Sequence, residues 1–199
     1  MLFKKVGRDI KETQAEEFIN STSDKETNDN TTKEKIIRIV FKIPKEVRKN
    51  IRKMIKGTVY LKKYYPMILK NDLTYFSDED IINIYMTAKL QNISMRDYVR
   101  IKLKLTKPQE VQFVTYPAER DLVIEQIELD KIDKDIITQK ARNLNTPVTH
   151  YGCIKMTAYC ELTPALLFSQ LELELLREEA KKNNLSLKEY LSKKINEEL

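Results

Sequence analysis

The sequence predicts a mainly α-helical protein with short β-strands, built from two related halves. Apolar residues recur at helical spacing in several segments, for example over residues 47–55. Shorter runs are rich in β-branched residues or alternate apolar with polar residues, which is typical of strands. The stretch AKLQNISMRDYVRIKL, from Ala88, returns 92 residues later as AKKNNLSLKEYLSKKI, from Ala180. This ungapped agreement indicates an internal duplication.

Composition and interruptions of the pattern divide the chain into three parts. The chain has 199 residues, and its 41% of hydrophobic residues is enough to bury a core. Residues 21–34, STSDKETNDNTTKE, are uniformly polar, so residues 1–34 are expected to form a disordered N-terminal arm. Pro108 interrupts the helical pattern between the copies. We therefore expect one repeat over residues 35–107 and a second over residues 108–199.

The first regular structure is expected at KIIRIVFKIPKEVRKNIRKMIKG, residues 35–57. A β-branched run to Ile43 predicts a strand, and Pro44 suits the first turn of a helix that Gly57 closes. A looser echo of this unit is LVIEQIELDKIDKDIITQKARN, from Leu122, which again passes from a β-branched run into a helical pattern. Both segments predict a strand followed by an amphipathic helix.

The duplicated segments predict two helices joined by a tight turn. Six residues are identical in the two copies: Ala88, Lys89, Asn92, Ser94, Tyr98 and Lys102 recur as Ala180, Lys181, Asn184, Ser186, Tyr190 and Lys194. Each first helix ends near the Asn, and each Ser is placed to cap the second helix. The two Tyr residues are expected to pack in the core.

A strand is predicted directly before the second copy. In CIKMTAYCEL, residues 153–162, apolar residues alternate with Lys155, Thr157, Tyr159 and Glu161. Thr163 and Pro164 then supply a helix start. The order strand, helix, turn at NNLS and capped helix resembles the ribbon-helix-helix (Arc/MetJ-like) family of DNA-binding proteins. The resemblance covers residues 153–199 and, more loosely, residues 61–105, so it implies two tandem ribbon-helix-helix modules.

In that family two strands form an antiparallel ribbon whose outer face reads bases in the major groove. The resemblance therefore implies base-reading roles for Lys155, Thr157, Tyr159, Lys63 and Tyr65. It also implies phosphate contacts at the second helix of each copy, by Ser94, Arg96, Ser186 and Lys188. The first strand, LKKYYPMILK from Leu61, does not alternate cleanly and contains Pro66. An alternative reading strand in the first repeat is RIVFKIPKEV, with Arg38, Val40 and Lys42 facing outward.

The resemblance predicts a sequence-specific double-stranded DNA-binding transcription regulator, similar to archaeal-virus regulators with two such motifs, in the host cell cytoplasm. Alternatives are a plasmid partition or relaxosome accessory protein, or a protein-protein interaction scaffold built from the same motifs. The strands near residues 63 and 155 would pair within one chain as an internal pseudo-dimer, or each with its counterpart in a homodimer. A higher assembly on DNA is compatible with either arrangement.

Charge and composition agree with a nucleic-acid partner and give no sign of catalysis. Residues 33–70 contain thirteen Lys and Arg against two acids, while the whole chain carries a net charge of +6. One histidine and two cysteines give no metal set, and no glycine-rich phosphate loop is present, so no enzyme, metal or cofactor is expected. No apolar run is long enough to span a membrane, and no secretory signal is evident, so an intracellular, soluble protein is expected.

Overall fold

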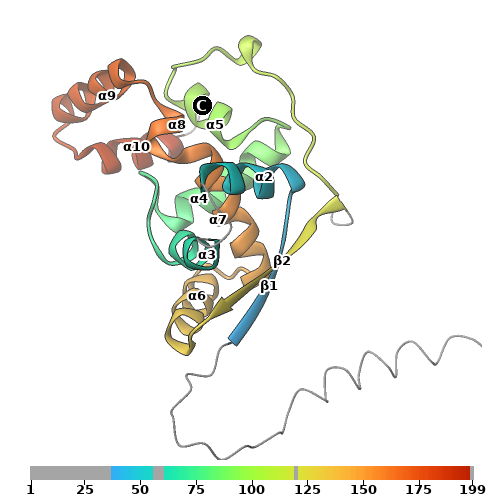
Figure 1. Ribbon diagram of the computed structural model, residues 1–199. Helices are drawn as coiled ribbons and strands as arrows, with labels where there is room; N and C mark the ends of the chain where they lie inside the picture. Colours follow the sequence, from blue (N-terminus) through green and yellow to red (C-terminus); the bar gives the residue numbers. More distant parts are fainter. Residues whose placement is uncertain (1–36, 56–60, 119–120, 198–199) are drawn as a thin grey trace, which may run out of the picture. The chain divides into compact units, whose positions relative to one another are not determined.

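The sheet of this protein is a two-stranded antiparallel ribbon that joins the two halves of the sequence (Figure 1). The computed structural model describes residues 37–55, 61–118 and 121–197, so the predicted arm, residues 1–34, lies outside the described residues. Strand β1, Ile37–Ile43, pairs with strand β2, Val123–Leu129. Val40 lies opposite Gln126 at the centre of the ribbon, and Ile37 and Ile43 lie opposite Leu129 and Val123 at its ends.

Nine α-helices and one 3₁₀ helix complete the described part of the chain. Helix α2, Lys45–Met54, starts directly after β1 at Pro44, as the sequence predicts. Helix α6, Lys131–Asn143, follows β2 in the same way and is capped by Asp130. The other helices are α3, Leu61–Lys70; α4, Asp78–Leu90; α5, Met95–Lys102; η2, Pro108–Glu110; α7, Val148–Leu162; α8, Pro164–Leu167; α9, Gln170–Lys182; and α10, Leu187–Asn196.

Helix α7 lies at the centre of the fold (Figure 1). It contacts β1 and helices α2, α3, α4, α5 and α6, and its residues 151–158 are all buried. One apolar core lies between α7, the ribbon and helices α2, α3 and α6, and the other lies between α7 and helices α4, α5, α8, α9 and α10. Gly152 allows the fully buried Phe41 ring of β1 to lie directly against the α7 backbone. Helix α7 is therefore the shared wall of both cores.

The predicted strands at residues 61–70 and 153–162 are wrong, because these segments form α3 and most of α7. The alternation in CIKMTAYCEL belongs to a helix that is buried on all sides, where polar residues survive only with buried partners. The two tandem ribbon-helix-helix modules are likewise not present in the described residues, which hold a mostly helical fold with a single two-stranded sheet. Each strand is seven residues long, so the sheet is also more than a short ribbon.

The duplicated segments do form the same local structure, which is two helices joined by a turn. Asn92 and Asn184 adopt left-handed backbone conformations, with φ of 54° and 55°. The amide after each Asn donates to the carbonyl of the Ala four residues before it, at 3.0 Å in both copies. Asn145, between α6 and α7, has φ of 49° and repeats the bond, again at 3.0 Å. Within the described residues this turn forms at Asn92, Asn145 and Asn184, and Lys104 after α5 adopts the same conformation with φ of 58°. Tyr98, Tyr151 and Tyr190 occupy matching buried positions, each six residues after one of the three Asn residues.

Candidate nucleic-acid interface

The outer face of the ribbon presents polar and apolar side chains in alternating positions along both strands. Arg38, Val40 and Lys42 face outward from β1, and Ile124, Gln126 and Glu128 face outward from β2. Val40 and Ile124 are 45% and 65% exposed, so this face also presents apolar surface to solvent. Each strand therefore offers a row of three side chains to whatever contacts this face.

Cross-strand pairing sets the neighbours within this outer face. Arg38 lies opposite Glu128, and its Nη2 is 3.5 Å from Glu128 Oε1. Lys42 lies opposite Ile124 at the other end, and the Val40–Gln126 pair separates the two. The face is therefore cationic along β1 and mixed along β2.

The inner face of the ribbon fixes its position. Phe41 and Ile43 of β1 and Ile127 and Leu129 of β2 are buried in the core with α7. Because side chains alternate along a strand, this burial holds the outward residues in register. A change of an outward residue is therefore expected to leave the core packing unaltered.

One charged residue, Glu125, belongs to the inner face and ties the ribbon to α2. Glu125 is only 8% exposed and contacts Nε of Arg48 and, at 3.5 Å, Nη2 of Arg52. Burial, followed by the charge of Glu125, raises the pKa of the neighbouring Tyr65 phenol. Two cations around one carboxylate leave an excess positive charge, and the ion pairs orient α2 along the ribbon.

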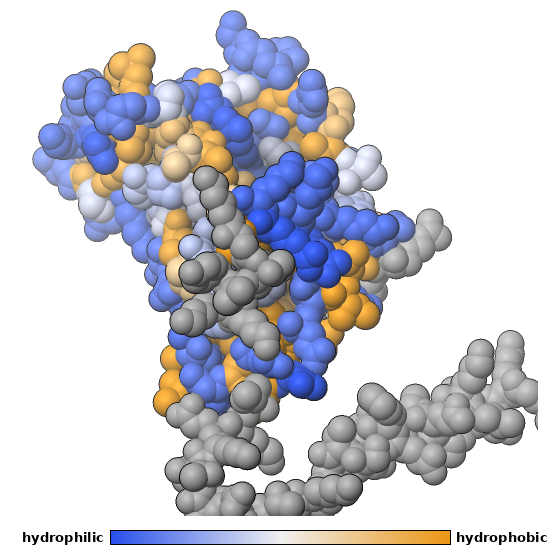
Figure 2. Space-filling view, viewed as in Figure 1, coloured by the Kyte–Doolittle hydropathy of each residue, from blue (hydrophilic) through white to orange (hydrophobic). Residues whose placement is uncertain are grey.

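The exposed side of α2 is a strongly basic surface next to the ribbon. A shallow groove there is lined by Val123 at the start of β2 and by five cations of α2: Lys45, Arg48, Lys49, Arg52 and Lys53. Figure 2 shows a strongly hydrophilic patch over this helix. Phosphate groups are the natural counter-ions for so dense a set of Lys and Arg. Five of the thirteen Lys and Arg residues counted in residues 33–70 thus lie together on one helix.

The residues assigned to base reading in the second copy lie inside the fold. Lys155 and Thr157 are each 4% exposed. Lys155 Nζ is 2.6 Å from Asp78 Oδ1, and Thr157 Oγ1 donates to the Cys153 carbonyl. Tyr159 is half-buried on the same helix. Their assignment depended on a strand that the fold does not contain, so we do not carry it further.

The residues assigned to base reading in the first copy, Lys63 and Tyr65, are not shown on an exposed strand either. Tyr65 is buried in α3, and the side chain of Lys63 lies outside the described residues. The strand of the alternative assignment is present as β1, with Arg38, Val40 and Lys42 on its outward side, while their role in base reading stays a prediction. The β-branched run before Pro44 had indicated this strand in the sequence. The outward residues of β2 were missed, although VIEQIEL alternates and was noted as an echo of the first unit.

The two predicted phosphate anchors differ in their surroundings. Ser94 caps α5 as expected, but Glu161 of α7 already accepts from the amide of Met95 at 2.8 Å and from that of Arg96 at 3.4 Å. A carboxylate at this helix start would repel a phosphate. Ser186 caps α10 as well. The α10 start differs in that its carboxylate, Glu189, belongs to its own capping box, and Lys188 lies exposed beside it.

Comparison with known proteins adds no identification: no protein-family model, curated protein or solved structure matches this chain. Within residues 37–55, 61–118 and 121–197, no helix is long and apolar enough to cross a membrane. The same part of the chain holds no group of three or more His, Cys, Asp or Glu side chains placed to bind a metal ion. The outward face of the ribbon and the basic side of α2 are therefore the surfaces whose chemistry points to a ligand.

Proposed function

We propose that this protein is a sequence-specific double-stranded DNA-binding protein, acting as a transcription regulator, whose β1–β2 ribbon enters the major groove. The observation that carries the proposal is an antiparallel two-stranded ribbon with a solvent-facing row of side chains on each strand, next to a helix with five cations. The major groove accommodates a two-stranded ribbon, and base edges there carry a distinct donor and acceptor pattern for each base pair.

The outward residues have the chemistry that base reading requires. Arg38 and Lys42 can donate to guanine, and Gln126 can form a bidentate pair with adenine. Val40 and Ile124 offer apolar contacts for thymine methyl groups. The cations of α2 supply phosphate contacts that position the ribbon without reading sequence. The ribbon would therefore determine the sequence specificity of binding, and α2 would determine most of its salt dependence.

The ribbon is complete within one chain, so we propose that a single chain binds one DNA site. Equivalent strand positions carry different residues: β1 presents Arg38, Val40 and Lys42 where β2 presents Ile124, Gln126 and Glu128. The preferred site is therefore expected to lack two-fold symmetry.

The test is selection of duplexes from a random pool, followed by affinity measurements at several salt concentrations. We expect Arg38→Ala and Gln126→Ala to weaken binding to the selected site by about 1–3 kcal/mol each and to relax its sequence preference. Lys49→Ala is expected to weaken specific and random duplexes alike and to reduce the salt slope by about 1. Lys181→Ala, on the exposed side of α9, is the matched control and should change neither.

Two outcomes would contradict the proposal. One is binding to DNA that is insensitive to every outward residue of the ribbon. The other is no salt-dependent binding at all, since about −0.9 is expected in the slope for each phosphate contact. A complete lack of salt-dependent binding would favour the protein-protein interaction scaffold. Salt-dependent DNA binding alone does not separate a transcription regulator from a plasmid partition or relaxosome accessory protein, because all of these bind DNA.

A further inference from the structure

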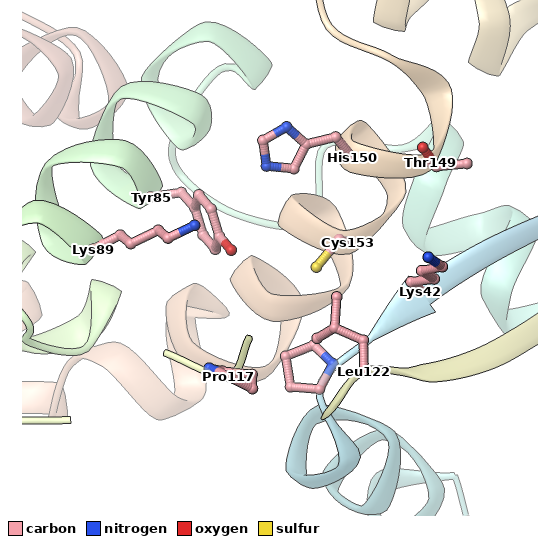
Figure 3. A pocket seen from close by; sticks show the side chains of 9 residues that line it. Lys42, Tyr85, Lys89, Pro117, Leu122, Thr149, His150 and Cys153 are labelled. Atoms are coloured by element: carbon pink, nitrogen blue, oxygen red, sulfur yellow. The ribbon is translucent and has the colours of Figure 1, made fainter. Parts of the chain in front are cut away.

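A cavity of about 310 Å³ lies between the end of the ribbon, α4 and the first turns of α7. Its chemistry-bearing side chains are Lys42, Tyr85, Lys89, Thr149, His150 and Cys153, and two prolines and a leucine complete the wall. Figure 3 shows Tyr85 and Lys89 entering from α4, with His150 and Cys153 on the α7 side. The volume lies at the lower end of the range of small-molecule pockets.

The lining favours a negatively charged group. None of the described residues that line the cavity is acidic, while Lys42 and Lys89 are cationic. Glu161 does not line the cavity, although its charge, after burial, contributes to the raised pKa of the neighbouring Tyr85; its carboxylate accepts a hydrogen bond from the Met95 amide of α5 at 2.8 Å. The first turn of α7, which forms one wall, has neither a side-chain cap nor an acidic residue. The local field is therefore positive.

The lining also provides a surface for a flat apolar group. The rings of Tyr85 and His150 meet edge to face, with centroids 6.1 Å apart. Partial burial and the charge of Lys89 lower the pKa of His150, so its imidazole is neutral at pH 7. Burial raises the pKa of Tyr85 to about 12, so its phenol stays protonated. Neutral rings beside ammonium groups suit a ligand with an aromatic part and an anionic part.

We propose that this cavity binds a small aromatic anion carrying a phosphate or carboxylate group, and that the bound anion weakens the contact of the ribbon with DNA. The first part stands on the cavity alone, and the second rests on the proposed function. Lys42 carries the coupling, because it lines the cavity and also belongs to the outward row of β1. An anion there adds negative charge beside the outward row that would enter the groove of the polyanionic DNA, so the two ligands oppose each other reciprocally.

The direct test is calorimetric titration of the full chain with phenyl phosphate in the absence of DNA. Inorganic phosphate and benzyl alcohol serve as controls for the two parts of the ligand. We expect saturable binding of phenyl phosphate that is at least tenfold tighter than that of either control. Lys89→Gln should weaken it at least tenfold, whereas Lys181→Gln, at the equivalent position of the duplicated segment, should leave it unchanged. Equal urea midpoints of both variants and the unaltered protein establish that folding is intact.

Absence of saturable binding, or equal binding by Lys89→Gln, overturns the proposal. A phosphate of the DNA backbone is the other source of the same chemistry. Should phenyl phosphate fail to bind while Lys89→Gln weakens DNA binding, the cavity serves the DNA backbone and the small-ligand proposal is wrong.

The regulatory part is tested with the selected duplex at saturating phenyl phosphate. We expect DNA affinity to fall at least threefold in the unaltered protein and to stay constant in Lys89→Gln. An unchanged affinity in the unaltered protein overturns the coupling. If the chain binds phenyl phosphate in a Lys89-dependent manner but binds no DNA, the proposed function fails and the cavity assignment stands.

Discussion

Replacing Gly152 by Ala tests the contact that holds the ribbon on α7. A Cβ at this position would overlap Cδ1 and Cε1 of the Phe41 ring and lie 2.9 Å from its Cγ. The ring is fully buried on the inner face of β1, so it has no open space into which to move. Overpacking of a close-packed core costs about 1–3 kcal/mol or more. The better helix propensity of Ala offsets this by about 1 kcal/mol.

We therefore expect Gly152→Ala to lower the free energy of unfolding by about 2 kcal/mol, taking the upper end of that overpacking range. With a urea m-value of about 2 kcal/mol/M, the midpoint should fall by about 1 M. The double variant Gly152→Ala/Phe41→Leu should be more stable than the sum of its single changes predicts, because the smaller side chain relieves the overlap. A neutral or stabilising Gly152→Ala, with additive behaviour in the double variant, would show that α7 does not press against Phe41.

Two further substitutions test two buried carboxylates, Asp78, whose pKa is lowered, and Glu161, whose pKa is raised. Lys155→Met should lower the free energy of unfolding by about 3 kcal/mol at pH 7, because it removes the closest cation of Asp78 and leaves only Lys140 Nζ, at 3.3 Å, to compensate the carboxylate. Burial is the largest single influence on Asp78 and opposes its ionisation, but Lys155, Tyr151 and Lys140 together lower the pKa of Asp78 below 3.8. The loss caused by the substitution should therefore shrink as pH falls below about 4 in urea titrations. Burial raises the pKa of Glu161 above 4.5, so ionisation of Glu161 lowers the free energy of unfolding progressively as pH rises above that value. Glu161→Gln should therefore gain stability relative to the unaltered protein between pH 4.5 and 7, and a constant difference would refute this.

The capped turns could be predicted because their signals are local. Ser94 and Ser186 cap α5 and α10 as the sequence predicts, since a serine three residues before an acid specifies a helix start without tertiary context. The strand β1 was likewise visible, because a β-branched run ends at a proline that suits a helix start. Such elements are fixed by residues within a few positions of one another.

Helix α7 could not be predicted because its environment decides its structure. A helix buried on all sides has no polar stripe, so a chance alternation over ten residues imitates a strand. Lys155 looked outward-facing in that alternation, but a lysine can be buried where Asp78 compensates its charge. Asp78 lies 77 residues away in the sequence, and no local pattern connects the two. The base-reading assignment failed for the same reason.

The two strands of the ribbon are related by a local symmetry whose spacing differs from that of the repeated turns. The strands pair about the Val40–Gln126 centre, where the two residues are separated by 86 positions, whereas the duplicated turns are separated by 92. Between its strand and its turn, the second half contains α7, which is longer than α3 of the first half, and also α8. The two halves therefore differ in length, although their strands pair symmetrically. The inner faces of the two strands also differ, because Glu125 in β2 stands at the position equivalent to Ile39 in β1. Glu125 forms ion pairs with Arg48 and Arg52 of α2. Because both strands belong to one chain, each can change independently, which a ribbon between identical chains does not permit. The basic α2 beside the ribbon and the unlike outward rows agree with such independent change, and under the proposed function they predict that a single chain contacts an asymmetric site.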